Sequence, residues 1–240
     1  MANPFKDIKE LTRDVEMYLR QNRSAIYNNS KRISDFFEMA CYNNIVRFYE
    51  NSGYDVTIQN LKRNKFNYKC TTAGNPENYS YFEVKKTIGH IGYKYEIRHN
   101  INVQSYHNKD TYTTPDILIL KPNSILIDDD FYESKMKYYY VKNSSIISFC
   151  EVKNFNPFPE LLFNFIGVVN ELRPNLLRKV NSSGKSHIAT TLMISGKSNS
   201  HADRIINNLQ SRYHINILCD LFNIGGVTFG RLSLNRLKTV

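Results

Sequence analysis

Three residues in the middle part of the chain have side chains that could together bind a divalent cation and act on a phosphate ester. Asp116 precedes a short apolar run, and Glu151 and Lys153 lie at the end of another one. Because residues i and i+2 of a strand point to the same face, Glu151 and Lys153 should project together. A neighbouring strand that carries Asp116 would bring a second carboxylate to this face.

The residue types at this point favour hydrolysis of a phosphodiester bond. Two carboxylates suit Mg²⁺, a hard ion that takes oxygen ligands and keeps several waters, and the backbone carbonyl of Val152 could add another oxygen. Lys153 could orient or help deprotonate a water, or offset the charge that develops on phosphate. We therefore predict Asp116, Glu151 and Val152 as metal ligands, and Asp116, Glu151 and Lys153 as catalytic residues.

A Glu-x-Lys triplet is a short pattern, and the chain contains three, at 83–85, 133–135 and 151–153. The triplet at 133–135 lies in a polar run without periodicity. The triplet at 83–85 lies in a strand-like run, but a Gly-rich turn follows it and no Pro-Asp strand precedes it. Only 151–153 has an acidic strand before it and a helix after it, which favours this triplet as the functional one.

The predicted elements that must position these residues alternate between helices and strands. Helices are expected at 5–22, from 34 or 35 to about 51, and at 160–173 and 202–213. Strands are expected at 54–58, 79–87, 93–104, 116–120, 146–153, 187–194 and 215–221. Asp35 and Glu38 fit a capping box at the start of the second helix. This order predicts one α/β domain with a mixed sheet.

The residues Pro115-Asp116 and Glu151-Val152-Lys153, in this context, resemble the PD-(D/E)xK nuclease superfamily. The resemblance spans residues 34 to about 220. It implies an α/β fold with a restriction-endonuclease-like core, in which helices flank a mixed central β-sheet, and a Mg²⁺-dependent nuclease activity. Members often carry a glutamate on the helix before the first strand, a place that Glu38 occupies here. Asp116 and Glu151 are 35 residues apart, which is a departure, since a simple hairpin needs fewer.

The resemblance also divides the chain. Residues 1–33 would form an N-terminal helical segment, and 34–240 the nuclease domain, with insertions at about 60–105 and 121–144. Glu38 is expected to support the metal or its water as a fourth catalytic residue. It shares a mostly apolar helical face with Cys41, Tyr42, Ile45 and Tyr49.

The charge balance is consistent with a polyanionic partner. The chain has 32 Lys and Arg against 22 Asp and Glu, a net charge of +10. A chain this basic attracts nucleic acid first. Arg173, Arg178 and Lys179, which follow the helix after the motif, are candidate contacts to nucleic acid. The N-terminus has no signal-peptide core and no run is long enough to span a bilayer, so we expect a cytoplasmic protein without a membrane partner.

The leading hypothesis is a metal-dependent DNA endonuclease of the kind used in restriction or defence, using Mg²⁺ with Mn²⁺ as a substitute. A homodimer would be the simplest way to cut both strands. A non-catalytic nucleic-acid-binding protein of the same fold and an RNA-directed nuclease stay open as alternatives. Two Gly-Lys-Ser triplets lack the glycine of a phosphate-binding loop. His90, His99 and His107 fit no compact ligand spacing and are interpreted as surface or hairpin residues.

Overall fold

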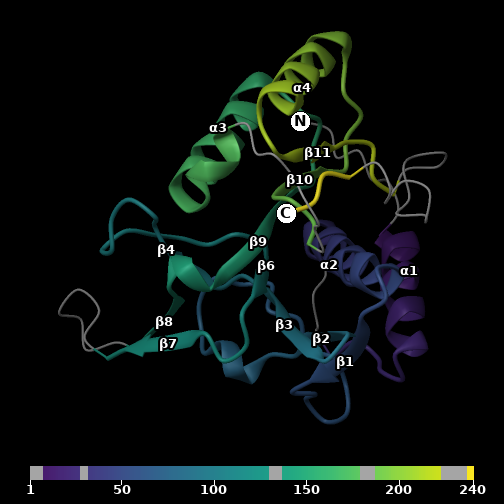
Figure 1. Ribbon diagram of the computed structural model, residues 1–240. Coiled ribbons are helices and arrows are strands. Elements are labelled where there is room, and N and C mark those ends of the chain that lie inside the picture. The colour runs from purple at the N-terminus through teal and green to yellow at the C-terminus, as the bar shows by residue number, and fades with distance from the viewer. Residues whose placement is uncertain (1–7, 28–31, 130–136, 179–186, 223–236) are drawn as a thin grey trace.

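The computed structural model describes residues 8–27, 32–129, 137–178, 187–222 and 237–240 (Figure 1). Its helices are α1 (Ile8–Gln21), α2 (Ile33–Asn51), α3 (Pro159–Leu172) and α4 (Ser200–Arg212). The strands of the main sheet are β1 (Asp55–Gln59), β2 (Tyr81–Ile88), β3 (Ile91–His99), β6 (Ile117–Leu120), β9 (Ile146–Lys153), β10 (Thr191–Ile194) and β11 (Asn216–Leu218). The fold is α/β, as the alternation of elements predicted.

The main sheet has the order β1-β2-β3-β6-β9-β10-β11 and is mixed. From β1 to β9 all neighbours are antiparallel, whereas β9, β10 and β11 are parallel. The change of direction follows from the connections. A tight turn joins β2 to β3, whereas the crossovers from β9 to β10 and from β10 to β11 contain α3 and α4, as parallel neighbours require. The predicted mixed sheet flanked by helices is confirmed.

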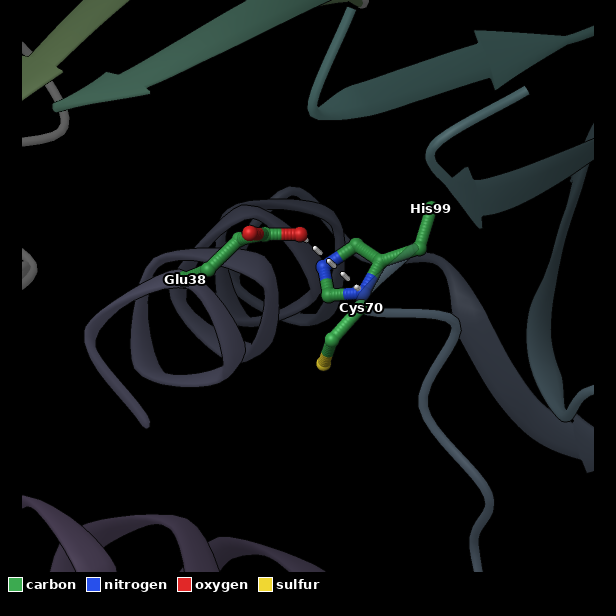
Figure 2. A group of neighbouring side chains, drawn as sticks. All are labelled: Glu38, Cys70 and His99. Carbon is green, nitrogen blue, oxygen red and sulfur yellow. Dashed lines mark ion pairs between the residues drawn. The ribbon is translucent and has the colours of Figure 1, made fainter. Parts of the chain in front are cut away.

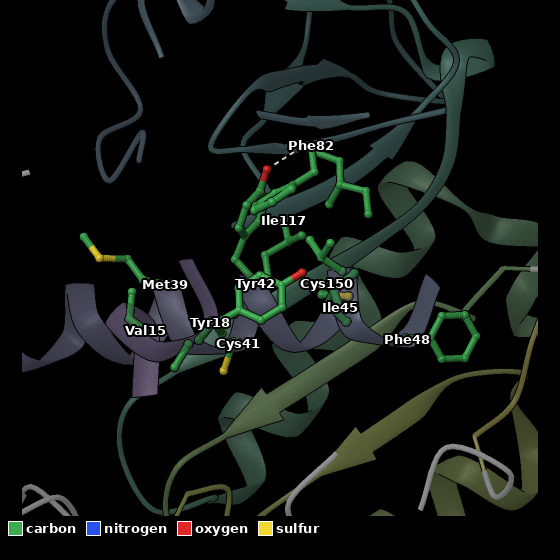
Figure 3. Packing of buried hydrophobic residues seen from close by; sticks show 14 of the residues in the cluster. Val15, Tyr18, Met39, Cys41, Tyr42, Ile45, Phe48, Phe82, Ile117 and Cys150 are labelled. Atoms are coloured by element: carbon green, nitrogen blue, oxygen red, sulfur yellow. Dashed lines mark hydrogen bonds between the residues drawn. The ribbon is translucent and has the colours of Figure 1, made fainter. Parts of the chain in front are cut away.

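The sheet has a separate apolar core on each face, and strand alternation assigns residues to them. In β6, Ile117 and Ile119 belong to a core that α1 and α2 cover, while Leu118 and Leu120 belong to one that α3 and α4 cover. Cys150 joins the first core from β9 (Figure 3). Asp116 lies immediately before β6, outside the strand, so alternation does not assign its side chain to either face.

Helix α2 is buried almost all round, because α1 covers it on the side away from the sheet. The Tyr18 hydroxyl of α1 donates a 3.1 Å hydrogen bond to Glu50 of α2, and the guanidinium of Arg47 lies 4.7 Å from the Tyr18 ring. On the sheet side the Tyr42 hydroxyl donates to the carbonyl of Ile97 in β3. The segment 8–21 thus contributes to the same core as the domain that follows it.

The start of α2 differs from the predicted capping box. The N-cap is Arg32, and no side chain caps the backbone there. Asp35 instead accepts a 3.0 Å hydrogen bond from Arg32 and lies inside the first turn. Glu38 is directed to the sheet rather than back to the helix terminus, since it accepts a bond from Asn100. The expectation of a capping box is therefore wrong.

Two stretches expected as insertions have regular structure. The range 60–105 contributes β2 and β3, which are inner strands of the main sheet, because their alternating apolar residues pack under α2. A second sheet has the order β5-β4-β8-β7 and comprises β4 (Asn102–Gln104), β5 (Tyr112–Thr113), β7 (Ile125–Asp128) and β8 (Tyr138–Val141). The range 121–144 forms half of this sheet, and three 3₁₀ turns at Pro76–Asn78, Asn143–Ser145 and Pro174–Leu177 complete the described elements.

No helix in the described part of the chain is long and apolar enough to cross a membrane.

Gly196 fixes the loop that follows the motif strand. Its N–H donates to the carbonyl of Phe155 at 3.2 Å, and a Cβ at this position would lie 2.5 Å from the Cα of Asn156 and 2.6 Å from the Phe155 oxygen. Side chains do not fit at such distances. The Gly-Lys-Ser triplet at 196–198 thus owes its glycine to a close approach of two backbones.

Replacement of Gly196 by Ala should lower the free energy of unfolding by about 1–3 kcal/mol, because the loop after β9 must move. Gly167 in α3 is a matched control, since a Cβ there meets nothing within 4 Å. Gly167→Ala should raise stability by up to about 1 kcal/mol through helix propensity. Urea unfolding followed by circular dichroism measures both, and equal effects at the two glycines would contradict this packing.

Candidate active site

The antiparallel register of β6 and β9 brings the two halves of the predicted motif together. Ile117 pairs with Cys150, and continuing this register by one residue sets Asp116 opposite Glu151. The two acids are 35 residues apart, and the segment between them includes β7 and β8 of the second sheet, so the chain leaves the main sheet and returns to it. The long separation in sequence is therefore compatible with adjacent strands.

Asp116, Glu151 and Lys153 form one hydrogen-bonded group. The Lys153 ammonium lies 2.8 Å from Glu151 Oε2 and 3.0 Å from Asp116 Oδ2. Asp116 Oδ2 also accepts a 2.6 Å hydrogen bond from the backbone N–H of Val152. Glu151 and Lys153 share a face of β9, as alternation predicted. Val152 binds the group through its amide, a contact that the sequence did not indicate.

Glu38 reaches this group from α2 through Asn100. The Asn100 amide nitrogen donates to Glu38 Oε1 at 2.5 Å and to the Lys69 carbonyl at 2.8 Å. The backbone N–H of Asn100 donates to the carbonyl of Asp116 at 3.1 Å. Asn100 has φ 47°, a left-handed conformation that asparagine tolerates better than most residues. It is a positioning residue that sequence reasoning missed, because an asparagine after a strand carries no functional signal.

The buried carboxyl groups of the site bind protons more tightly than usual. Burial, followed by the charge of Asp116, raises the pKa of Glu38 to about 8 and that of Glu151 to about 7. Burial alone would lower the pKa of Lys153, but the carboxylates of Asp116 and Glu151 outweigh it and raise that pKa above its usual value. Lys153 is therefore an ammonium ion at neutral pH, suited to donating hydrogen bonds rather than accepting a proton.

The competing triplet at 83–85 has a different environment. Glu83 forms ion pairs with Lys85 at 2.6 Å and with Lys94. These lysines lower the pKa of Glu83, although burial acts in the opposite direction as the largest single influence. Glu83 is thus a carboxylate matched by two cations, and Glu96, the acid directly opposite it in β3, is itself paired with Arg98, as expected of structural ion pairs. Glu133 of the third triplet lies outside the described residues.

The predicted nucleic-acid contacts separate into different roles. Arg173 is half-buried and donates a 2.9 Å hydrogen bond to the carbonyl of Ile146, which ties the end of α3 to the start of β9. This contact gives Arg173 a structural role that the sequence did not predict. Arg178 is exposed, and Lys179 lies outside the described residues.

The three histidines interpreted as surface or hairpin residues differ in burial, and His99 lies in the second strand of the β2–β3 hairpin. His90 and His107 are exposed, but His99 at the end of β3 is only 3% exposed. It lies beside Glu38 and Cys70, and the ligand atoms of the three residues are all within 4.8 Å of one another. Neither His99 nor Cys70 belongs to the predicted site. Their positions, 29 residues apart in sequence, give no recognisable metal-binding spacing.

No protein-family model, curated protein or solved structure was found to match the chain. The assignment of the site therefore depends on its own residues.

The raised pKa values predict that removal of a buried acid stabilises the metal-free protein at high pH. When the pKa of a carboxyl is higher in the folded state, the folded protein loses stability as the pH rises from the unfolded-state pKa to the folded-state pKa. The unfolded-state pKa is near 4.5, and the folded-state pKa is about 7 for Glu151 and about 8 for Glu38. Glu151→Gln and Glu38→Gln cannot lose that proton. In EDTA, the free energy of unfolding of each variant, relative to that of the wild type, should be about 1–3 kcal/mol higher at pH 8.5 than at pH 5.

Urea unfolding at the two pH values measures this difference. Glu160→Gln, which removes an exposed acid from the first turn of α3, is the matched control and should keep the pH dependence of the wild type. A wild-type stability that rises between pH 5 and 8.5, with no gain in the two variants, would show that the carboxylates are not strained.

Proposed function

We propose that this protein is a metal-dependent endonuclease with a restriction-endonuclease-like core, related in its motif to the PD-(D/E)xK superfamily. The observation that carries the proposal is the contact of the Lys153 ammonium with both Asp116 and Glu151, at 3.0 and 2.8 Å. The motif predicts that two acids and a lysine meet at one strand end. Of the two triplets that lie within the described residues, the one selected from sequence context has this arrangement.

The donor set fits a hard divalent cation. The charge of Asp116 raises the pKa of both Glu38 and Glu151, and Lys153 is the cation in direct contact with Asp116 and Glu151. The raised pKa values of Glu38 and Glu151 indicate that these buried acids have too little positive charge around them. Because the acids offer oxygen alone, Mg²⁺ or Mn²⁺ suits them. Such an ion would polarise the phosphate and stabilise its transition-state charge.

The protein groups have distinct tasks in this proposal. Asp116 and Glu151 would hold the cation, with the Val152 amide fixing the orientation of Asp116 through their 2.6 Å hydrogen bond. Lys153, as an ammonium ion, would orient the attacking water or donate to a phosphate oxygen. Of the roles considered for this lysine, the raised pKa favours these two over proton abstraction. Glu38 would support the site from α2 through its bond to Asn100.

DNA is the proposed substrate because the chain carries a net charge of +10, and basic chains bind polyanions. Arg178, which is exposed beyond α3, remains a candidate phosphate contact, whereas the hydrogen bond of Arg173 to the Ile146 carbonyl favours a structural role. A dimer that cuts both strands belongs to the same proposal. A protein that binds nucleic acid without cleaving it and a nuclease that acts on RNA are the alternatives, and substrate assays separate them.

Replacement of each central residue by a neutral residue of similar size should reduce the rate of plasmid cleavage by about 10²-fold or more. Asp116→Asn, Glu151→Gln and Lys153→Met each remove a charge that acts mainly in the transition state. Binding of the plasmid should persist, since the removed carboxylates repel phosphate. Glu38→Gln should fall between these variants and wild type if its role is supporting.

Glu83→Gln and Lys85→Met form the matched control pair, because they break a Glu-x-Lys ion pair of similar length in the same sheet. Initial rates of supercoiled plasmid loss, with circular dichroism to check folding, measure all five variants and Glu38→Gln. Loss of cleavage in the control pair together with activity in Glu151→Gln would place the site at β2 instead. Binding without cleavage in the wild type would favour the non-catalytic alternative.

A further inference from the structure

Three residues beside the proposed active site form a cluster that its mechanism does not use in full. Glu38 comes from α2, Cys70 from the coil between β1 and β2, and His99 from the end of β3 (Figure 2). Glu38 Oε1 lies 3.9 Å from His99 Nδ1, and all three ligand atoms are within 4.8 Å of one another. Elements far apart in sequence thus bring a carboxylate, a thiol and an imidazole together.

His99 is the second observation that points to a ligand. The side chain is buried, and neither ring nitrogen has a hydrogen-bond partner among the residues described here. Burial of an unpaired polar group is costly and rare, so an unpaired imidazole in a core needs an explanation. The ring is held in place by Tyr42, whose ring centroid is 4.0 Å away, and by Tyr68 at 5.7 Å. Its orientation toward Glu38 is therefore set by packing.

The ammonium group of Lys69, which lies near the cluster, does not occupy it. Lys69 directs its ammonium group to the carbonyl oxygens of Asn100, at 2.8 Å, and of Thr71, at 2.5 Å. These bonds keep it on the backbone rather than on the three ligand atoms. Cys70 is a free cysteine of intermediate exposure.

The donor chemistry differs from that of the neighbouring acids. Thiolate and imidazole favour borderline ions such as Zn²⁺, whereas Mg²⁺ prefers oxygen alone. In a tetrahedral zinc site the ligand atoms lie about 3.3–3.8 Å apart, given bonds of about 2.0–2.3 Å. The Glu38 to His99 distance of 3.9 Å is already close to that range, and Cys70, which lies outside regular secondary structure and within 4.8 Å of the other two ligand atoms, has to move by at most about 1 Å.

We propose that Glu38, Cys70 and His99 bind a zinc-type transition-metal ion, separate from the cation at Asp116 and Glu151. On binding, the Cys70 thiol releases its proton to solvent and a sulfur–metal bond forms. Three protein ligands leave the remaining position to water or to a substrate group. Glu38 connects the two sites, since it lies close enough to Asp116 to feel its charge. The proposal does not require that the protein cleave nucleic acid.

Cobalt(II) added to the EDTA-treated and desalted full-length protein tests the assignment, because Co²⁺ replaces Zn²⁺ and a thiolate ligand gives a sulfur-to-cobalt charge-transfer absorption. We expect this band at one equivalent of Co²⁺ and its loss on addition of Zn²⁺. Cys70→Ser should abolish it and His99→Gln should weaken cobalt binding at least tenfold. Cys219→Ser, which changes another cysteine of intermediate exposure, is the matched control and should retain the band.

Absence of the band in the wild type, or its persistence in Cys70→Ser, would overturn the proposal. Because His99 is buried and its variant could fail to fold, X-ray absorption of the zinc-loaded wild type gives a second measurement. It should show one sulfur at about 2.3 Å with nitrogen and oxygen ligands near about 2.0 Å. A shell of oxygen and nitrogen alone would overturn the assignment as well.

The same experiments distinguish this site from the proposed nuclease site. Asp116→Asn and Glu151→Gln should keep the cobalt band, since neither residue contributes a ligand. A protein that cleaves DNA but shows no thiolate band retains the proposed function and loses the zinc site. A protein that shows the band but does not cleave DNA retains the zinc site and loses the proposed function.

Discussion

The arrangement of the candidate site depends on the pairing of β6 with β9. This antiparallel register sets Asp116 opposite Glu151, and a shift of one residue would turn Glu151 and Lys153 toward α2 and Cys150 and Val152 toward α3. Both faces of β9 are buried, so such a shift would place two charges in an apolar core. The packing that holds the sheet together is thus the same constraint that brings the acids and the lysine within hydrogen-bonding distance.

The site gathers three carboxyl groups in a largely buried region, where water screens their charges least. Glu38, Asp116 and Glu151 are all largely buried, and the ammonium of Lys153 contacts only two of them. The raised pKa values of Glu38 and Glu151 express this imbalance. By contrast Glu83, with the same Glu-x-Lys spacing, has two lysine partners and a lowered pKa. Electrostatic strain therefore separates the proposed functional triplet from a structural one, although their sequences are alike.

Much of this arrangement could be predicted from local patterns. Alternation along 146–153 indicated that Glu151 and Lys153 share a face, and the periodicity of α2 placed Glu38 with inward residues. These inferences succeeded because the periodicity of a strand or a helix by itself determines which side chains share a face. That Asp116 would reach the neighbouring strand was an expectation from the motif, since no local pattern reports which strands pair.

The contacts that sequence reasoning missed depend on tertiary structure. Asn100, Cys70 and His99 reach the site from segments without a spacing signal, and Arg173 was assigned to nucleic acid because its buried bond to Ile146 could not be foreseen. Asp35 and Glu38 matched a capping box, but Asn100 and the sheet offered Glu38 a closer partner. Side chains that bond across the fold are the ones that local patterns assign least well.

The most direct test of the central claim is the fate of supercoiled plasmid incubated with the wild-type protein in Mg²⁺, compared with the same mixture in excess EDTA. If Asp116, Glu151 and Lys153 form a cation-dependent nuclease site, Mg²⁺ should convert the plasmid to nicked and linear forms, and EDTA should stop the conversion. Cleavage at the same rate in EDTA, or intact plasmid in Mg²⁺ and Mn²⁺ at every salt concentration at which the protein binds DNA, would contradict the claim.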